Sequence, residues 1–209
     1  MTRARRTAGV TLAVTVLLGL AGCADDGEDE ADRAPTSTSP SPTTETSAAP
    51  TGDPPPDGKP FGPACGRFDS PSGRPVDQIA EMPTSLFVLG QAELRDAFGK
   101  MMQVGLGQKK DVTFFLPTNK AINAVPFDVR GEIVTNPDKA RSYFGHHVVE
   151  GRLEPSQLAG EHPTLNDDVL TVTLTGQDFG VGLQGAHILC GNIETVGARI
   201  YVVDQAIIS

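Results

Sequence analysis

The chain has 209 residues and a formal net charge of −9 at pH 7, with 26 acidic residues against 17 Lys and Arg. Residues 61–209 keep this sign, since their 17 acids and 12 bases give −5. An acidic surface argues against nucleic acid as a partner, because contact with phosphates needs a surplus of basic side chains. It argues equally against a polybasic contact with membrane headgroups.

Residues 1–22 have the pattern of a bacterial lipoprotein signal peptide. A basic start with three arginines precedes an apolar run over 10–20, which is too short to span a bilayer comfortably. The run ends in Leu20-Ala21-Gly22-Cys23, which resembles a lipobox, the motif whose cysteine receives diacylglycerol before cleavage. We therefore predict that Cys23 is lipidated and that the chain is held on the outer face of the cell membrane, where stable anchoring takes a second acyl chain. The alternatives are an ordinary signal peptide with a chance cysteine and an uncleaved anchor.

Residues 23–60 are predicted to be a disordered tether, acidic and rich in Pro, Thr and Ser. After Cys23 the segment has no aromatic residue and no Leu, Ile or Val, and it carries nine acids against two bases. Such a composition buries too little apolar surface to offset the entropy of the chain. It is typical of a plain spacer and also of an O-glycosylated stalk. The remaining 61–209 has the size of one domain.

Two cysteines remain beyond the predicted lipid site, Cys65 and Cys190. Outside the cytoplasm such a pair favours a disulfide over a metal site or a reactive thiol, and neither cysteine has a CxxC partner. A bridge would close a loop of 125 steps along the chain, which the chain-entropy model values at about 5 kcal/mol.

Helices are predicted over 75–81 and 92–104, the second from apolar residues at i, i+3, i+4 and i+7. The run SLFVL at 85–89 fits either a strand or a helical turn. In the stretch DVTFFLPTNKAINAVP, 111–126, a buried strand ends at Pro117, which has no N–H to donate, and Thr118 can cap a short helix.

Asn136 and Pro137 predict the N-cap and first residue of a further helix. From residue 146 onward the apolar pattern changes to period 2, most clearly in VLTVTLT at 169–175. Helices in the first half and strands in the second indicate an α+β fold rather than an alternating parallel one.

Three motifs, in order, resemble the fasciclin domain family over nearly all of 75–208. The first motif lies in the 111–126 stretch and is matched by Thr113, Phe115, Pro117, Thr118 and Asn119. The second is YFGHHVVEGRL at 143–153, centred on His147. The third is GNIETVGARIYVVDQAI at 191–207, which includes Asp204. The cysteine pair and the segment HPTLNDDVLTV bring the chain closer still to the mycobacterial secreted immunogenic antigens of this family.

The resemblance implies a β-sandwich or wedge of short strands flanked by several helices. It also implies an adhesive or protein-binding role without an established catalytic centre. In this family the motif histidine corresponds to His147, which we expect to serve the core by hydrogen bonding more than a ligand. His146 stands where many animal members carry a Tyr linked to integrin binding, so that activity is not carried over.

His146 and His147 are the candidate binding region. On a strand, adjacent side chains point to opposite faces, so the two histidines would not chelate one metal ion, and no metal is predicted. GVGLQG at 180–185 matches GxGxxG but precedes a strand rather than a helix, so it indicates a hairpin or a bulge and not a phosphate site.

No GxSxG elbow or complete P-loop is present, so we predict neither an enzyme nor a cofactor. The predicted function is adhesion or contact with an extracellular or envelope protein. The alternative is an envelope carrier or sensor of a small lipid, glycolipid or polysaccharide.

Overall fold

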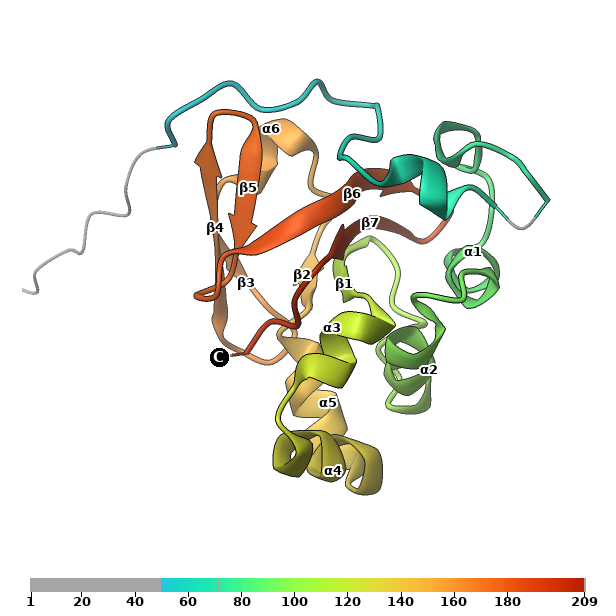
Figure 1. Ribbon diagram of the computed structural model, residues 1–209, viewed down its shortest axis with the longest axis vertical. Helices are drawn as coiled ribbons and strands as arrows, with labels where there is room; N and C mark the ends of the chain where they lie inside the picture. Colours follow the sequence, from blue (N-terminus) through green and yellow to red (C-terminus); the bar gives the residue numbers. More distant parts are fainter. Residues whose placement is uncertain (1–49, 71, 209) are drawn as a thin grey trace, which may run out of the picture. The chain divides into compact units, whose positions relative to one another are not determined.

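The computed structural model describes residues 50–70 and 72–208, so the predicted signal peptide, Cys23 and most of the predicted tether lie outside the described residues. Seven strands form one sheet in the order β2-β1-β7-β6-β5-β4-β3, with helices beside it (Figure 1). The strands are β1 (Val112–Pro117), β2 (Val148–Glu150), β3 (Gly160–Pro163), β4 (Val169–Thr175), β5 (Asp178–Val181), β6 (Ala186–Glu194) and β7 (Ala198–Val203). The helices are α1 (Thr84–Gly90), α2 (Arg95–Gln103), α3 (Asn119–Ala124), α4 (Phe127–Thr135), α5 (Pro137–Gly145) and α6 (Pro155–Leu158), with 3₁₀ turns η1 (Cys65–Phe68) and η2 (Val76–Gln78). The predicted α+β class is confirmed.

Two inner strands of the sheet form a parallel pair, β1 beside β7, whose residues are all buried. Because side chains alternate along a strand, these two strands divide the core in two. Phe114 and Leu116 pack in a cluster with the helices, whereas Phe115 packs with Tyr201 in a second cluster, their rings stacked 5.6 Å apart. Leu170, Val172 and Leu174, the buried residues of β4, also belong to this second cluster.

The sheet curls until its two edge strands meet. An isolated bridge joins Val149 of β2 to Thr164 directly after β3. In β4, Leu170, Val172 and Leu174 are buried inside the curl while the threonines between them are at least partly exposed. The period-2 pattern predicted here is confirmed, and the sheet has the wedge form that was expected.

The predictions for the helices are partly confirmed. Asn136 caps α5, its side chain accepting the N–H groups of Asp138 and Lys139, and SLFVL lies in α1. The helix predicted over 75–81 is wrong, because only the 3₁₀ turn η2 forms there, which suffices to bury Val76 and Ile79. Helix α4 was not predicted, since Ile133 is its only buried residue and leaves no apolar stripe. No described helix is both long and apolar enough to cross a membrane.

We call residues 51–64 the strap. Disorder was predicted up to residue 60, but residues 51–60 are held by the contacts described below, so the prediction is wrong for them. At one end, Thr51 exchanges backbone hydrogen bonds with Leu174 and Gly176 at the β4–β5 turn. At the other end, Phe61 and Gly191 of β6 donate N–H groups to each other's carbonyls at 3.1 and 2.8 Å. These contacts are mostly backbone hydrogen bonds, which composition does not reveal.

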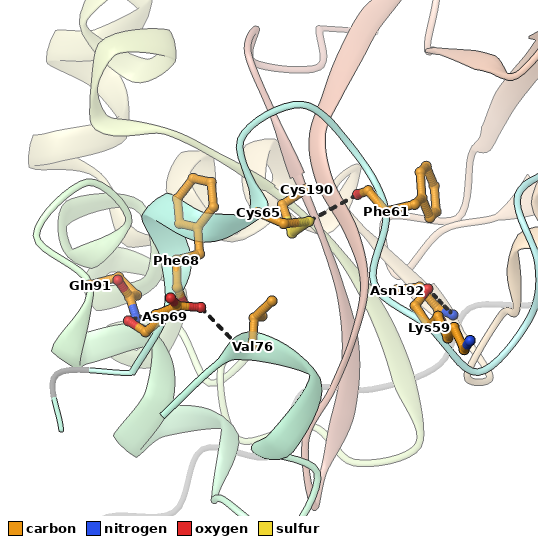
Figure 2. Close-up of a disulfide and its surroundings, with 9 residues drawn as sticks. All are labelled: Lys59, Phe61, Cys65, Phe68, Asp69, Val76, Gln91, Cys190 and Asn192. Carbon is orange, nitrogen blue, oxygen red and sulfur yellow. Dashed lines mark hydrogen bonds between the residues drawn. A yellow bond between two sulfur atoms is a disulfide. The ribbon is translucent and has the colours of Figure 1, made fainter. Parts of the chain in front are cut away.

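Further side-chain contacts hold the middle of the strap. Asp57 accepts both the backbone N–H (3.0 Å) and the hydroxyl (2.7 Å) of Ser156 in α6. The Asn192 amide donates to the Lys59 carbonyl at 3.1 Å, as Figure 2 shows. The packed unit therefore begins before the predicted boundary at residue 61.

A disulfide joins Cys65 and Cys190 and so connects η1 to β6 directly after the strap (Figure 2). The Cα atoms lie 4.7 Å apart and the sequence separation is 125 residues. Cys190 is fully buried in the helical core cluster. The disulfide predicted from the compartment and the cysteine count is thus present.

Reducing this disulfide will destabilise the domain, because a long loop in the unfolded chain is then no longer closed. We expect the free energy of unfolding to fall by about 5 kcal/mol or less. Denaturant unfolding of the full chain with and without reductant measures the change. The Cys65→Ala/Cys190→Ala variant is the control, since reductant must have no further effect on it. Equal stability of the oxidised and reduced chains would contradict the prediction.

Candidate binding surface at the His146–His147 motif

His146 and His147 lie at the joint between a helix and a strand. Helix α5 ends at Gly145, His146 is its C-cap, and β2 begins only at Val148. The expectation that the two histidines lie on a strand is therefore wrong, because the helix continues up to them and the strand is only three residues long. Their side chains nevertheless have different environments.

His147 is fully buried, and both of its ring nitrogens bond to the backbone. Nδ1 lies 3.1 Å from the carbonyl of Tyr143, and Nε2 accepts the N–H of Ile207 at 3.0 Å. An acceptor at Nε2 requires the proton on Nδ1, so the ring is neutral with a fixed tautomer. Burial lowers the pKa of His147 to about 3, helped by the nearby His146 and opposed by the hydrogen bond to Tyr143. The residue is a structural link between α5 and the chain after β7, and it has no nitrogen left for a ligand.

His146 lies at the surface, with 12% of its side chain exposed. Its Nδ1 pairs with the carboxylate of Asp168, and its Nε2 lies 3.3 Å from the Asn166 amide nitrogen. Asp168 in turn accepts a hydrogen bond from the Thr164 hydroxyl. Among the described residues no group of three or more His, Cys, Asp or Glu is placed to hold a metal ion.

Beside His146 the surface is apolar. A hollow of about 180 Å³ is lined by His146 and Asp168 together with apolar side chains from β4, the β5–β6 turn and the chain after β7. Three of these are well exposed, Val169 at 60%, Leu183 at 87% and Ile208 at 39%. We call Val169, Leu183 and Ile208 the His146 patch. Grouped exposed apolar residues of this kind with a polar margin are typical of a protein contact.

The sequence prediction named His146 and His147 but missed Val169 and Leu183. The sequence contained a feature that could have indicated each of these two residues. Leu183 is a large apolar residue inside the glycine-bounded turn GVGLQG, which is a hairpin turn between β5 and β6 as predicted. Val169 occupies an outward position of β4, where the alternation otherwise places threonine.

The five motif residues predicted to be structural do not line this hollow, although Ile207 at the end of the third motif does. Thr113 donates its hydroxyl to the Gly151 carbonyl and accepts the N–H of Leu153, which fixes the loop after β2. Pro117 is the last residue of β1, and Thr118 accepts the N–H of Ala121 and so caps α3.

The other two motif residues also bind backbone groups. The side chain of Asn119 donates to the Ala92 carbonyl and accepts the N–H of Asp96, and so joins α3 to the start of α2. Asp204 accepts the N–H of His187 at 2.8 Å. All these contacts join structural elements to one another.

The buried neutral His147 makes stability depend on pH. The unfolded chain takes up a proton at this histidine near pH 6.5, whereas the folded chain does so only near pH 3. The stability that neutral His147 contributes to the folded chain is therefore complete above pH 6.5 and is lost as the pH falls toward 3. At pH 5 we expect a loss of about 2 kcal/mol relative to pH 7.

Urea unfolding of the full chain and of His147→Gln at both pH values isolates this contribution, because the variant keeps every other titratable side chain of the protein. The variant should be less stable at pH 7 and should lose less stability on acidification. The same pH dependence in both proteins would show that another group is responsible.

The comparisons with known proteins agree with the three motifs. The family model for the fasciclin domain matches residues 82–209. Over 95 residues the chain is 34% identical to "Immunogenic protein MPB70" of Mycobacterium bovis, which covers 46% of this chain and 48% of that protein. Over 97 residues it is 31% identical to "Cell surface glycolipoprotein MPB83" of the same species, which covers 46% and 43%. The chain thus spans about half the length of these curated relatives, or less.

A solved structure of a FAS1 domain pair from the insect cell adhesion molecule fasciclin I is similar at a TM-score of 0.42 and 18% identity, covering 55% of this chain and 45% of that chain. The resemblance to the mycobacterial immunogenic antigens is confirmed by the sequence relatives. Because the family model covers more than half of the chain and includes all three motifs, the chain belongs to the fasciclin domain family.

Proposed function

We propose that this chain is a lipid-anchored cell-surface protein whose fasciclin domain mediates adhesion or contact with another protein outside the cell. The observation that carries this proposal is the His146 patch, with its three exposed apolar side chains around a partly buried ion pair. The proposed role is one of binding, without a catalytic step and without a cofactor.

The relatives support the surface location. One of them is named a cell surface glycolipoprotein, and the motif Leu20-Ala21-Gly22-Cys23 gives this chain its own candidate for lipidation. Many copies held on one membrane would let a weak contact act through avidity.

The chemistry of the His146 patch favours a protein partner over a bound small lipid. Pockets that enclose a ligand usually measure about 300–1,000 Å³. The hollow beside His146 measures about 180 Å³, and the core clusters beneath it are filled by side chains. A partner would instead cover the exposed tips of Val169 and Leu183, with Asp168 and His146 at the margin. The alternative of an envelope lipid carrier is therefore not favoured at this site.

Cys23→Ser should abolish lipidation of the chain. Without the thiol no diacylglycerol can be attached, and because lipidation precedes cleavage, residues 1–22 should also stay on the chain. Intact-mass measurement of the protein expressed in a bacterium would show the loss of the lipid mass together with the retained mass of residues 1–22. Cys190→Ser, which also removes a thiol, should keep the lipid mass. Absence of a lipid mass from the unaltered chain, or an unchanged mass for Cys23→Ser, would contradict the prediction.

Placing a charge in the His146 patch should abolish partner binding without unfolding the domain. Val169 and Leu183 are exposed, so Asp at either position removes apolar contact area and adds a desolvation cost only in the complex. We expect Val169→Asp/Leu183→Asp to reduce binding of bead-displayed full chain to extracellular matrix proteins or cells at least tenfold.

Val196→Asp is the matched control, because Val196 is 57% exposed but lies at the β6–β7 turn. It should bind like the unaltered chain, and circular dichroism should show that all variants are folded. Equal loss in the control and the patch variant, or loss in neither, would argue against the patch.

A further inference from the structure

A second hollow lies on the strap side of the sheet. It measures about 490 Å³ and is formed between the strap and strands β5 and β6. The strap side contributes Pro55, Pro56, Phe61 and Pro63, which lie outside the segment that matches the fasciclin family model. We call this hollow the strap groove. It is a feature of this chain's own N-terminal extension of the domain, separate from the His146 patch.

The groove exists because β5 and β6 separate. They pair only at Gly180 with His187 and at Val181 with Ala186, after which β6 pairs with β7 instead. In Figure 1, β6 runs diagonally away from β5 while the strap passes above them. Since the strap is fixed at Thr51 and again at Phe61, it bridges the opening with both ends held.

The apolar wall of the groove is centred on Phe61. Its ring lies 5.7 Å from that of Phe179 and 6.1 Å from that of Tyr201, and it remains partly exposed. Gly191 makes this position possible, because a Cβ there would lie 2.8 Å from the Phe61 ring. The aromatic ring is therefore held in place by its own backbone pairing and by its neighbours before any ligand arrives.

The polar side of the groove has three different hydrogen-bonding groups. Gln177, Asp178 and His187 are exposed and line the groove. Among the described residues, none of their side chains makes a hydrogen bond or an ion pair. An amide, a carboxylate and an imidazole together offer both donors and acceptors to a ligand.

The apolar wall and the polar groups of the strap groove together favour some classes of ligand over others. No Lys or Arg is among the described residues that line the groove, which disfavours phosphates and other anions. The exposed polar groups disfavour an acyl chain, since their hydrogen bonds to water would be lost without replacement. A sugar ring has an apolar C–H face that packs on the negative face of an aromatic ring, and a rim of hydroxyls that need donors and acceptors.

We propose that the strap groove binds a saccharide of one or two pyranose rings, with Phe61 against the apolar face of a ring and Gln177, Asp178 and His187 on its hydroxyls. The volume is in the usual range for a small-ligand site. This proposal goes beyond the protein contact of the His146 patch, and neither depends on the other.

Saturation-transfer NMR of the full chain in a mild detergent tests the proposal, with maltose, cellobiose, mannobiose and N,N′-diacetylchitobiose as probes. We expect at least one disaccharide to give a saturable signal. In the variant Gln177→Ala/Asp178→Asn its affinity should fall about tenfold or more, because Ala removes one hydrogen-bonding group and Asn replaces a charged acceptor with a weaker neutral one. Both residues are exposed, so the variant should fold normally.

Two controls make the result specific. Glu161→Gln on β3 is the same acid-to-amide change at an exposed position that is not among the residues lining the groove, and it should leave the affinity unchanged. Val169→Asp/Leu183→Asp should also leave it unchanged, which separates this site from the proposed protein contact. The proposal is overturned if none of the four sugars gives a saturable signal, or if the groove variant binds as well as the controls.

Discussion

β1 and β7 lie side by side in parallel along their whole length, although most of the domain separates them in sequence. Parallel strands cannot be joined by a tight turn, so everything between them must fold as a long crossover. Because both strands are buried on both faces, their side chains contribute to both core clusters. The first family motif contains β1 and the third contains β7, which explains why both motifs are rich in apolar residues.

The second motif attaches the crossover to that pair. His147, which directly follows the C-cap of α5, accepts the N–H of Ile207 after β7 and thereby fixes the last described residues beside the end of the helix. That attachment places Ile208 beside His146, where both line the same hollow. The buried histidine thus shapes the candidate surface without touching a ligand, and its neighbour and the apolar residues around it are the groups a partner would meet.

The parts of the fold that could be predicted from the sequence are those with a strong local pattern. The alternation in β4, the proline-terminated strand β1 and the Asn136 cap of α5 each follow from neighbouring residues alone. The helix–strand joint at His146 could not be placed, because a three-residue strand has no periodicity of its own. The strap could not be predicted either, since its composition indicates disorder while backbone pairing to Gly191 and Gly176 holds it.

The candidate sites lie at opposite ends of one hairpin. Val169 begins β4 and the Leu183 turn follows β5, whereas Thr51 joins the sheet at the β4–β5 turn, next to Gln177 and Asp178. Seven residues of β4 separate these ends by about 20 Å, at roughly 3.3 Å per residue. The chain therefore enters the described domain at the end that carries the strap groove. A saccharide in the strap groove and a protein on the His146 patch would therefore occupy different surfaces, so the two proposed contacts could be made at the same time.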